Sequence, residues 1–240
     1  VVEEAQGMTK RHIVAAVGLV ALLAVPLFGP GKYALHLMVM ALLWSFIYTS
    51  WSIMGRLGLV SFGHGAFLGI GAYTVVLLWN HWGISPWIGT VVAVVLSLGV
   101  ALLVGLPCFR FKIVGHYFAL VTLALSEVTR LIIVGLRDHT GGSLGLTPKP
   151  ALTDGATANL AALQFEDKTV WFYAVLVLWL LALWVWHRVD GSMNRLALEA
   201  ISEEEDAAAS IGIDVTRAKL TVTLISAAMT CVGGVLYAQY

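Results

Sequence analysis

Two side chains that could act together in catalysis, Ser61 and His64, lie in the stretch GLVSFGHGAFLGIGAY at residues 58–73. On a helix, a spacing of three residues brings the serine hydroxyl and the imidazole near each other, as nucleophilic catalysis requires. The same stretch holds no third group that could orient the histidine. An enzyme is therefore the weakest of the interpretations considered below, and we assign no catalytic residue and no metal ligand.

A second polar pair, Glu127 and Arg130, interrupts the apolar residues 117–132. Three residues apart on a helix, the two side chains are close enough to form an ion pair. Each ion costs about 2.5 to 3.5 kcal/mol at the centre of a lone membrane helix, so we expect both to turn inward and to be partnered. Thr122 extends the same polar face. The pair either fixes the helix geometry or takes part in gating or in a solute path.

The composition indicates what kind of protein must position these groups. Of the 240 residues, 59% are hydrophobic and 12% are charged, the formal net charge is +0, and the mean hydropathy is +0.88. These values are typical of a membrane protein, and the absence of net charge gives no indication of nucleic-acid binding. Cys108 and Cys231 fall within or at the end of apolar segments and indicate no redox compartment.

Apolar segments long enough to cross a bilayer recur along the whole chain. A hydrocarbon core of about 30 Å needs about 20 mainly apolar residues per helix, and about seven segments meet this requirement. They are His12–Phe28, Tyr33–Ile53, Leu57–Trp79, Pro86–Cys108, His116–Leu136, Val170–Trp186 and Thr216–Ala238. The sequence therefore predicts an all-α, polytopic transmembrane helix bundle that forms one domain over residues 1–240.

The basic residues between these segments predict the orientation. With the N-terminus in the cytoplasm, most of them fall on the inner side, as the positive-inside rule requires. The inner group is Lys10, Arg11, Arg56, Arg110, Lys112, Arg188, Arg195, Arg217 and Lys219, and the outer group is Lys32, Arg137, Lys149 and Lys168. Residues 137–169 then form an extracytoplasmic loop whose tip, TGGSLGLTP, carries Gly141, Gly142 and Gly145. This tip is either a functional outer-loop element or a plain surface turn.

The glycine block has two compatible interpretations. Ser61, Gly65 and Gly69 recur every fourth residue and form a stripe of small side chains on one helical face, which favours close helix packing in a membrane. Alternatively, the glycines interrupt the helix and expose backbone groups to a permeating solute, with His64 facing the cavity. The residues predicted to line a translocation pathway or to pack helices are Ser61, Gly63, His64, Gly65, Gly69, Gly71, Tyr117, Thr122, Glu127 and Arg130.

The predicted cytoplasmic loop, residues 188–215, contains the signature of a short helix. Ser202 and Glu205 have the spacing of a capping box, and the acidic run Glu203–Asp206 suits a helix N-terminus. The alanines that follow propagate a helix, and Gly212 can end it. Such a helix is either an exposed connector or a knob that inserts into a groove on another protein.

Several blocks, taken in order, carry a resemblance to a known family. They are GLVSFGHGAFLGIGAY, GHYFALVTLALSEVTRLI, TGGSLGL, and EAISEEEDAAASIGIDVTRAKL followed by SAAMTCVGGVLYA. The chain resembles the permease subunits of bacterial ABC importers for branched-chain amino acids, in particular the LivM-type subunit. This resemblance implies the import of branched-chain or other small neutral amino acids, or of amides such as urea, across the bacterial inner membrane.

The resemblance also implies a role for the cytoplasmic loop. Residues 206–212 match the importer pattern Glu-Ala-Ala-x-x-x-Gly with Asp in place of Glu, although the Ile-x-Leu-Pro element of the general pattern is absent. The segment Ser202–Gly212 would then be the coupling helix that docks on an ATPase. The ATPase-coupling residues implied are Ser202, Glu204, Glu205, Asp206, Ala207, Ala208 and Gly212.

The chain has no G-x-x-x-x-G-K-[ST] phosphate-binding loop, so we expect no cofactor in this chain, with ATP and magnesium bound by a partner. The implied partners are cytoplasmic P-loop ATPase subunits, a second permease subunit and an extracytoplasmic solute-binding protein, in a multi-pass assembly surrounded by membrane lipid.

LivM-type permeases continue beyond the position of Tyr240, so we expect a C-terminally truncated chain. The alternative function is an ion-coupled secondary transporter with Glu127, Arg130 and His64 as its coupling charges.

Overall fold

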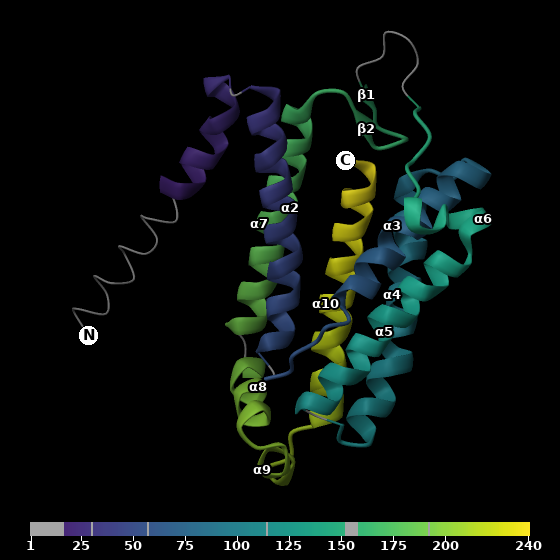
Figure 1. Ribbon diagram of the computed structural model, residues 1–240. Helices are drawn as coiled ribbons and strands as arrows, with labels where there is room; N and C mark the ends of the chain where they lie inside the picture. The colour runs from purple at the N-terminus through teal and green to yellow at the C-terminus, as the bar shows by residue number, and fades with distance from the viewer. Residues whose placement is uncertain (1–16, 30, 57, 114, 152–157, 192) are drawn as a thin grey trace.

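The computed structural model describes residues 17–29, 31–56, 58–113, 115–151, 158–191 and 193–240, and they form a bundle of long helices (Figure 1). An apolar helical segment, Val17–Phe28, ends in the 3-10 turn η1 (Val25–Phe28). The longer helices are α2 (Lys32–Gly55), α3 (His64–Trp82), α4 (Pro86–Arg110), α5 (Gly115–Gly135), α7 (Lys168–Asp190), α8 (Met193–Glu203) and α10 (Val215–Gln239). The short elements are α6 (Arg137–Thr140), η2 (Gly142–Leu144), β1 (Ala158–Asn159), β2 (Gln164–Phe165) and α9 (Glu205–Ser210). The predicted all-α, polytopic fold is confirmed.

Five helices in the described part of the chain, α2, α4, α5, α7 and α10, are long and apolar enough to cross a membrane, and the seven expected spans are not confirmed. The third expected span is represented by α3, which begins at His64 and carries the polar Asn80 and His81 in its last turn, and it is not among the five candidate spans. The first expected span, His12–Phe28, is represented by the helical segment Val17–Phe28, which is too short to cross a membrane. Residues 12–16 of this expected span lie outside the described residues.

The chain between α2 and α3 is not helical over residues 58–63, although the sequence there is apolar. The backbone N–H of Phe62 donates to Thr122 Oγ1 at 3.1 Å, and that of Gly63 donates to Ser61 Oγ at 3.2 Å. Because side chains satisfy these donors, irregular backbone can lie inside the bundle. The glycine block therefore interrupts the predicted helix before α3 begins, and its later glycines are helical.

Helix α10 is the central element of the bundle. In Figure 1 it lies between the pair α2 and α7 on one side and the group α3, α4 and α5 on the other. Its contacts are with α3, α4 and α2, while α2 packs against α7 and α5 packs against α3. In the spanning window of α10, 56% of the residues are buried, against 17% for α5. The helix that carries Glu127 and Arg130 is thus an open edge of the bundle.

Glycines let α3 and α10 approach to backbone contact. A Cβ atom added at Gly71 of α3 would overlap the carbonyl group of Cys231, and one added at Gly234 of α10 would overlap that of Leu68. Small residues at such crossings allow close packing between helices in lipid. Gly71, which lies beside the predicted stripe, is therefore helical and packs against α10.

Candidate translocation hollow and coupling loop

A hollow of about 480 Å³ lies between α3 and α5, at the open edge of the bundle. It brings together predicted residues from three blocks of the sequence: the glycine block, the polar pair on α5 and the outer-loop tip. Its lining residues are Gly65, Tyr73, Leu123, Ser126, Glu127, Thr129, Arg130, Ile133, Val134 and Gly142. Four predicted residues, Gly65, Glu127, Arg130 and Gly142, meet at this hollow.

Glu127 and Arg130 form the predicted ion pair on one face of α5. Arg130 Nη2 donates to Glu127 Oε1 at 2.5 Å and Nε donates to Oε2 at 3.0 Å, a two-pronged geometry that suits a guanidinium and a carboxylate. The expectation that both side chains turn into the bundle is wrong for this chain, because they are 53% and 59% exposed. Their charges are paired with each other along α5 itself.

His64 lies away from this hollow, in a packed junction of three helices. Its Nε2 lies 2.7 Å from Ser226 Oγ of α10, and the Ser226 hydroxyl donates to the carbonyl oxygen of Ser50 of α2 at 2.7 Å. Because the single hydroxyl proton goes to Ser50, the ring nitrogen must carry a proton and donate it to Ser226. His64 is 8% exposed and not among the residues that line the hollow. The structure thus favours helix packing for His64.

Ser61 and His64 do not form the pair that catalysis would need. The imidazole Nε2 bonds Ser226, while the Ser61 hydroxyl accepts the backbone N–H of Gly63. Among the described residues, no group of three or more His, Cys, Asp or Glu side chains is placed to hold a metal ion. The geometry gives the enzyme interpretation no support.

The small-residue stripe of α3 faces α5. A Cβ atom added at Gly65 would lie 3.0 Å from Ser126 Oγ, and one added at Gly69 would lie 3.7 Å from Ile133 Cδ1. The stripe therefore packs closely on α5 at Gly65, which also lines the hollow, and makes only ordinary contact with α5 at Gly69. Thr122 is buried at this interface, whereas Tyr117 is 75% exposed on the outer surface of α5 and does not reach the hollow.

The outer-loop tip is a glycine turn that caps α5 and α6. Gly141, Gly142 and Gly145 all have positive φ angles, and a Cβ atom at Gly141 would overlap the carbonyl oxygen of Gly145. Thr140 Oγ1 donates to the carbonyl oxygen of Ile133 at 2.5 Å, which ties the turn to α5. Only glycine fits such backbone conformations without strain, so the turn interpretation accounts for these residues. Gly142 also borders the hollow.

The predicted coupling loop consists of two helices, α8 and α9, and the expected capping box is wrong. Ser202 lies in the last turn of α8, where its hydroxyl donates to the carbonyl oxygen of Glu199 at 3.0 Å. Glu204 is the N-cap residue of α9 and makes no side-chain cap. The α8 helix continues through Ser202 because the preceding residues, rich in Leu, Ala and Glu, favour helix and pack one side on the bundle.

Gly212 ends α9 as predicted. Its φ is +91°, its N–H donates to the carbonyl oxygen of Ala209, and the N–H of Ile213 donates to that of Ala208. This pair of bonds is a Schellman motif. Ala208 is 2% exposed and packs against Leu198 and the other apolar residues beneath the loop, whereas Ala207 is exposed. Ala207 therefore belongs to the free face of α9.

Two acidic residues that were expected to face a partner instead bind α9 to its own bundle. Glu205 forms an ion pair with Lys219 of α10, whose side chain is 1% exposed. Lys219 Nζ also lies 5.8 Å from the centre of the Phe109 ring of α4. A buried lysine requires such a partner, because an unpaired charge in an apolar interior is strongly unfavourable. The Glu205–Lys219 pair therefore connects α9 to the central helix of the bundle.

Asp206 makes the second connection, to the end of α4. Lys112 Nζ donates to Asp206 Oδ1 at 2.6 Å, and both side chains are mostly exposed. This hydrogen bond and the lysine charge hold the pKa of Asp206 below its ordinary value, and the same contact raises the pKa of Lys112. The acidic residues of α9 thus hold the loop in place, and Glu204, Ala207 and Ala209 remain on its exposed surface.

Lys219 and Lys112 were not predicted as site residues, only as charges on the inner side. The run RAKLTVTL offered a signal for Lys219, since a lysine one turn inside an apolar spanning segment must find a partner. Nothing local indicated that this partner is Glu205, because the pairing depends on the packing of α9 against α10.

The chain as a whole matches a family of membrane transporters. The family described as "Branched-chain amino acid transport system / permease component" matches residues 33–240. The chain belongs to this permease family. It is 34% identical over 203 residues to the high-affinity branched-chain amino acid transport system permease protein LivM of Salmonella typhimurium, and 33% identical over 203 residues to LivM of Escherichia coli. No solved structure matches it significantly.

Each of these alignments covers 78% of this chain and 47% of the relative. The chain therefore spans about half the length of the curated relatives that it matches. It is a membrane protein of a transport family, and its long apolar helices agree with that assignment.

Proposed function

We propose that this chain is part of a permease subunit of an ATP-driven ABC importer in the bacterial inner membrane. Its solutes would be branched-chain or other small neutral amino acids, the first being the solute class printed in the relatives' names. The observation that carries the proposal is α9, a short helix at one end of the bundle, joined by ion pairs to α10 and to Lys112 in the turn after α4, and exposed on its remaining face. Such a helix can transmit a partner's movement to the bundle.

The distribution of basic residues supports a cytoplasmic position for α9. Helices α8 and α9 lie at the opposite end of the bundle from strands β1 and β2 (Figure 1). The α9 end carries Arg56, Arg110, Lys112, Arg188, Arg195, Arg217 and Lys219. The other end carries Lys32, Arg137, Lys149 and Lys168. The excess at the α9 end is what the positive-inside rule expects of the cytoplasmic side.

The open edge at α5 supports a role for a second permease subunit. A polar ion pair on a spanning helix is costly in lipid, and here it faces a hollow that the rest of this chain leaves open. A second subunit packed over α5 would close the hollow into a pathway lined by Glu127, Arg130 and Tyr73. A solute-binding protein would deliver solute to the end that carries the glycine turn.

The mechanism follows from these two regions. ATP would bind to partner subunits, which would also supply the magnesium site. Its binding would favour one position of α9 relative to those subunits over another. The Glu205–Lys219 pair passes this preference to α10, which contacts α2, α3 and α4. Movement of α10 against α3 would then alter access to the hollow from the two sides of the membrane.

The test is ATP-driven uptake of leucine by proteoliposomes that contain the full-length permease and its native partner subunits. Ala207→Trp adds bulk to the exposed face of α9 and should weaken ATPase association by about tenfold or more, with loss of uptake. Ala161→Trp, on an exposed residue near β2, is the matched control and should leave both unchanged. Uptake that follows an ion gradient and ignores ATP would support the ion-coupled alternative instead.

A further inference from the structure

The non-helical residues 58–63 between α2 and α3 contact both the coupling loop and the helix that borders the hollow. We call them the linking segment. Its first residue lies against α8, because a Cβ atom added at Gly58 would lie 3.3 Å from Ser202 Cβ. Its last residue lies against α5, because a Cβ atom added at Gly63 would lie 3.2 Å from Thr122 Cβ and 3.2 Å from the carbonyl oxygen of Thr122. The proposed transport cycle gives this segment no role.

Hydrogen bonds fix the end of the linking segment to α5 and α2. The backbone N–H of Phe62 donates to Thr122 Oγ1 at 3.1 Å, and the Thr122 hydroxyl donates to the carbonyl oxygen of Ala119 at 3.0 Å. Trp51 Nε1 of α2 donates to the carbonyl oxygen of Ser61 at 2.9 Å. Thr122 is 5% exposed, so its bonds are shielded from water, which strengthens them.

Helix α5 packs mainly on α3 and leaves most of its spanning window exposed. Among the described hydrogen bonds, the one from Phe62 to Thr122 is the bond that joins α5 to a segment far from it in the sequence. Ser126 and Glu127, which line the hollow, follow Thr122 by about 6 to 8 Å at 1.5 Å per residue. The single bond to the linking segment therefore lies close to the hollow.

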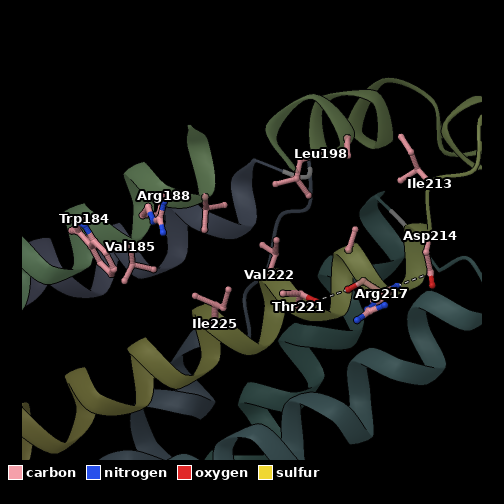
Figure 2. A pocket seen from close by; sticks show the side chains of 13 residues that line it. Trp184, Val185, Arg188, Leu198, Ile213, Asp214, Arg217, Thr221, Val222 and Ile225 are labelled. Atoms are coloured by element: carbon pink, nitrogen blue, oxygen red, sulfur yellow. Dashed lines mark hydrogen bonds between the residues drawn. The ribbon is translucent and has the colours of Figure 1, made fainter. Parts of the chain in front are cut away.

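At the other end of the linking segment, α8 has room to move. A groove of about 660 Å³ lies between α8 and the helices α7 and α10, with Leu198 of α8 and Val222 of α10 among its lining residues (Figure 2). Packing of α8 on these two helices is thus incomplete. The linking segment contacts α8 directly, since Leu59 is 4% exposed and belongs to the same apolar cluster as Ile201 of α8.

We propose that Thr122 is a positioning residue that transmits movement of the coupling loop to α5 through the linking segment. The inference rests on the proposed function, in which partner subunits move the loop, and it adds a second route beside the Glu205–Lys219 pair. Displacement of α8 moves Gly58, and the bond from Phe62 carries this movement to Thr122. Because α5 is a continuous helix, the side chains at the hollow move with Thr122.

The test compares leucine uptake with ATP hydrolysis in proteoliposomes that contain the full-length permease and its native partner subunits. Thr122→Val keeps the shape of the side chain and removes the acceptor of the Phe62 N–H. Leucine taken up per ATP hydrolysed should fall about fivefold, as the loss of one shielded hydrogen bond allows, while the rate of ATP hydrolysis is retained. Thr122→Ser keeps the hydroxyl and should restore the ratio.

The matched control is Thr90→Val, which removes a hydroxyl that donates within α4, to the carbonyl oxygen of Pro86, and should leave the ratio unchanged. A wild-type ratio in Thr122→Val would overturn the inference and leave the proposed function standing. Equal losses in Thr122→Val and Thr122→Ser would show that the side chain acts through packing, which would also overturn it. Wild-type uptake that ignores ATP would overturn both proposals.

A cross-linking experiment tests the other end of the linking segment in the full-length permease without its partners. In the Gly58→Cys, Ser202→Cys variant the Cβ atoms lie near the separation of about 3.5 to 4.5 Å that a disulfide needs, so mild oxidation should remove both free thiols. Gly55→Cys with Ser202→Cys is the matched control and should not cross-link, because a Cβ atom at Gly55 has no neighbour within 4 Å.

The cross-linked variant then tests whether α8 and the linking segment move together. In the complete transporter, its uptake should be the same before and after oxidation, because the inference requires this contact to persist through the cycle. Failure of Gly58→Cys and Ser202→Cys to cross-link would overturn the inference. Loss of uptake on oxidation, with recovery on reduction, would show that the contact must open, and that result would overturn it as well.

Discussion

The two polar regions of the molecule satisfy their charges in opposite ways. At the open edge, Glu127 and Arg130 pair within a single turn of α5, and both side chains stay more than half exposed. At the coupling end, Glu205 and Lys219 pair between α9 and α10, and the lysine is 1% exposed. The first pair needs no tertiary contact, whereas the second forms only when the loop is packed on the bundle. We infer that the coupling end depends on its ion pair for structure and that the open edge keeps its pair for function.

The largest effect should come from breaking the buried pair. Glu205→Gln leaves the Lys219 charge buried without a partner and should destabilise the protein by about 3 kcal/mol or more. Adding Lys219→Met to this variant removes the stranded charge and should restore most of the stability. Thermal unfolding in detergent measures both. If the single and double variants unfold at the same temperature, the ion pair does not hold α9 to α10.

The two faces of α3 should respond very differently to the same added methyl group. Gly71→Ala places a Cβ atom against the backbone of α10 and should cost about 1 to 3 kcal/mol of stability. Gly69→Ala places it in ordinary contact with Ile133 beside the hollow and should cost little. Unfolding temperatures of the two variants provide the comparison. Equal losses would mean that the open edge is packed as tightly as the contact with α10.

The exposed pair on α5 should affect transport more than stability. Arg130→Gln leaves Glu127 exposed beside the hollow, so the unfolding temperature should stay near that of the wild type, while leucine uptake falls strongly. The control is Thr129→Val, which removes a neighbouring hydroxyl from the same hollow without changing any charge. If Arg130→Gln lowered stability and uptake in proportion, the pair would be structural.

The smallest effect should come from the exposed Asp206–Lys112 pair, and it should depend on pH. Contact with Lys112 holds the pKa of Asp206 below its ordinary value, so the stabilisation is fully present above that ordinary value. It is lost as the pH falls through the lowered pKa of the folded state. The small difference in stability between wild type and Asp206→Asn should therefore vanish in strong acid. A difference that grew towards acid pH would contradict this assignment.

Local features of the chain were predictable from the sequence, and contacts between distant segments were not. The Glu127–Arg130 pair and the end of α9 at Gly212 depend on residues within one or two helical turns, and both predictions are confirmed. The capping box failed because Ser202 lies inside a longer helix that is stabilised by packing on the bundle. The partners of Lys219 and His64 are 14 and 162 residues away, and only the folded bundle brings them together.

The seven expected spans are not confirmed, and the later start of α3 has a related physical reason. Composition alone could not show that residues 58–63 remain non-helical, since that conformation depends on Thr122 of α5 and on the Ser61 hydroxyl accepting backbone N–H groups. The openness of the α5 face was equally hidden, because the sequence shows which residues are polar but not which helix faces remain uncovered.

The most direct test of the account places a photo-crosslinking amino acid at position 207 of the full-length permease in its native membrane, with position 161 as the control. The account predicts that residue 207 cross-links to a cytoplasmic P-loop ATPase and that residue 161 does not. A cross-link from residue 207 to an extracytoplasmic protein, or labelling of this position by an impermeant reagent added outside intact cells, would contradict it.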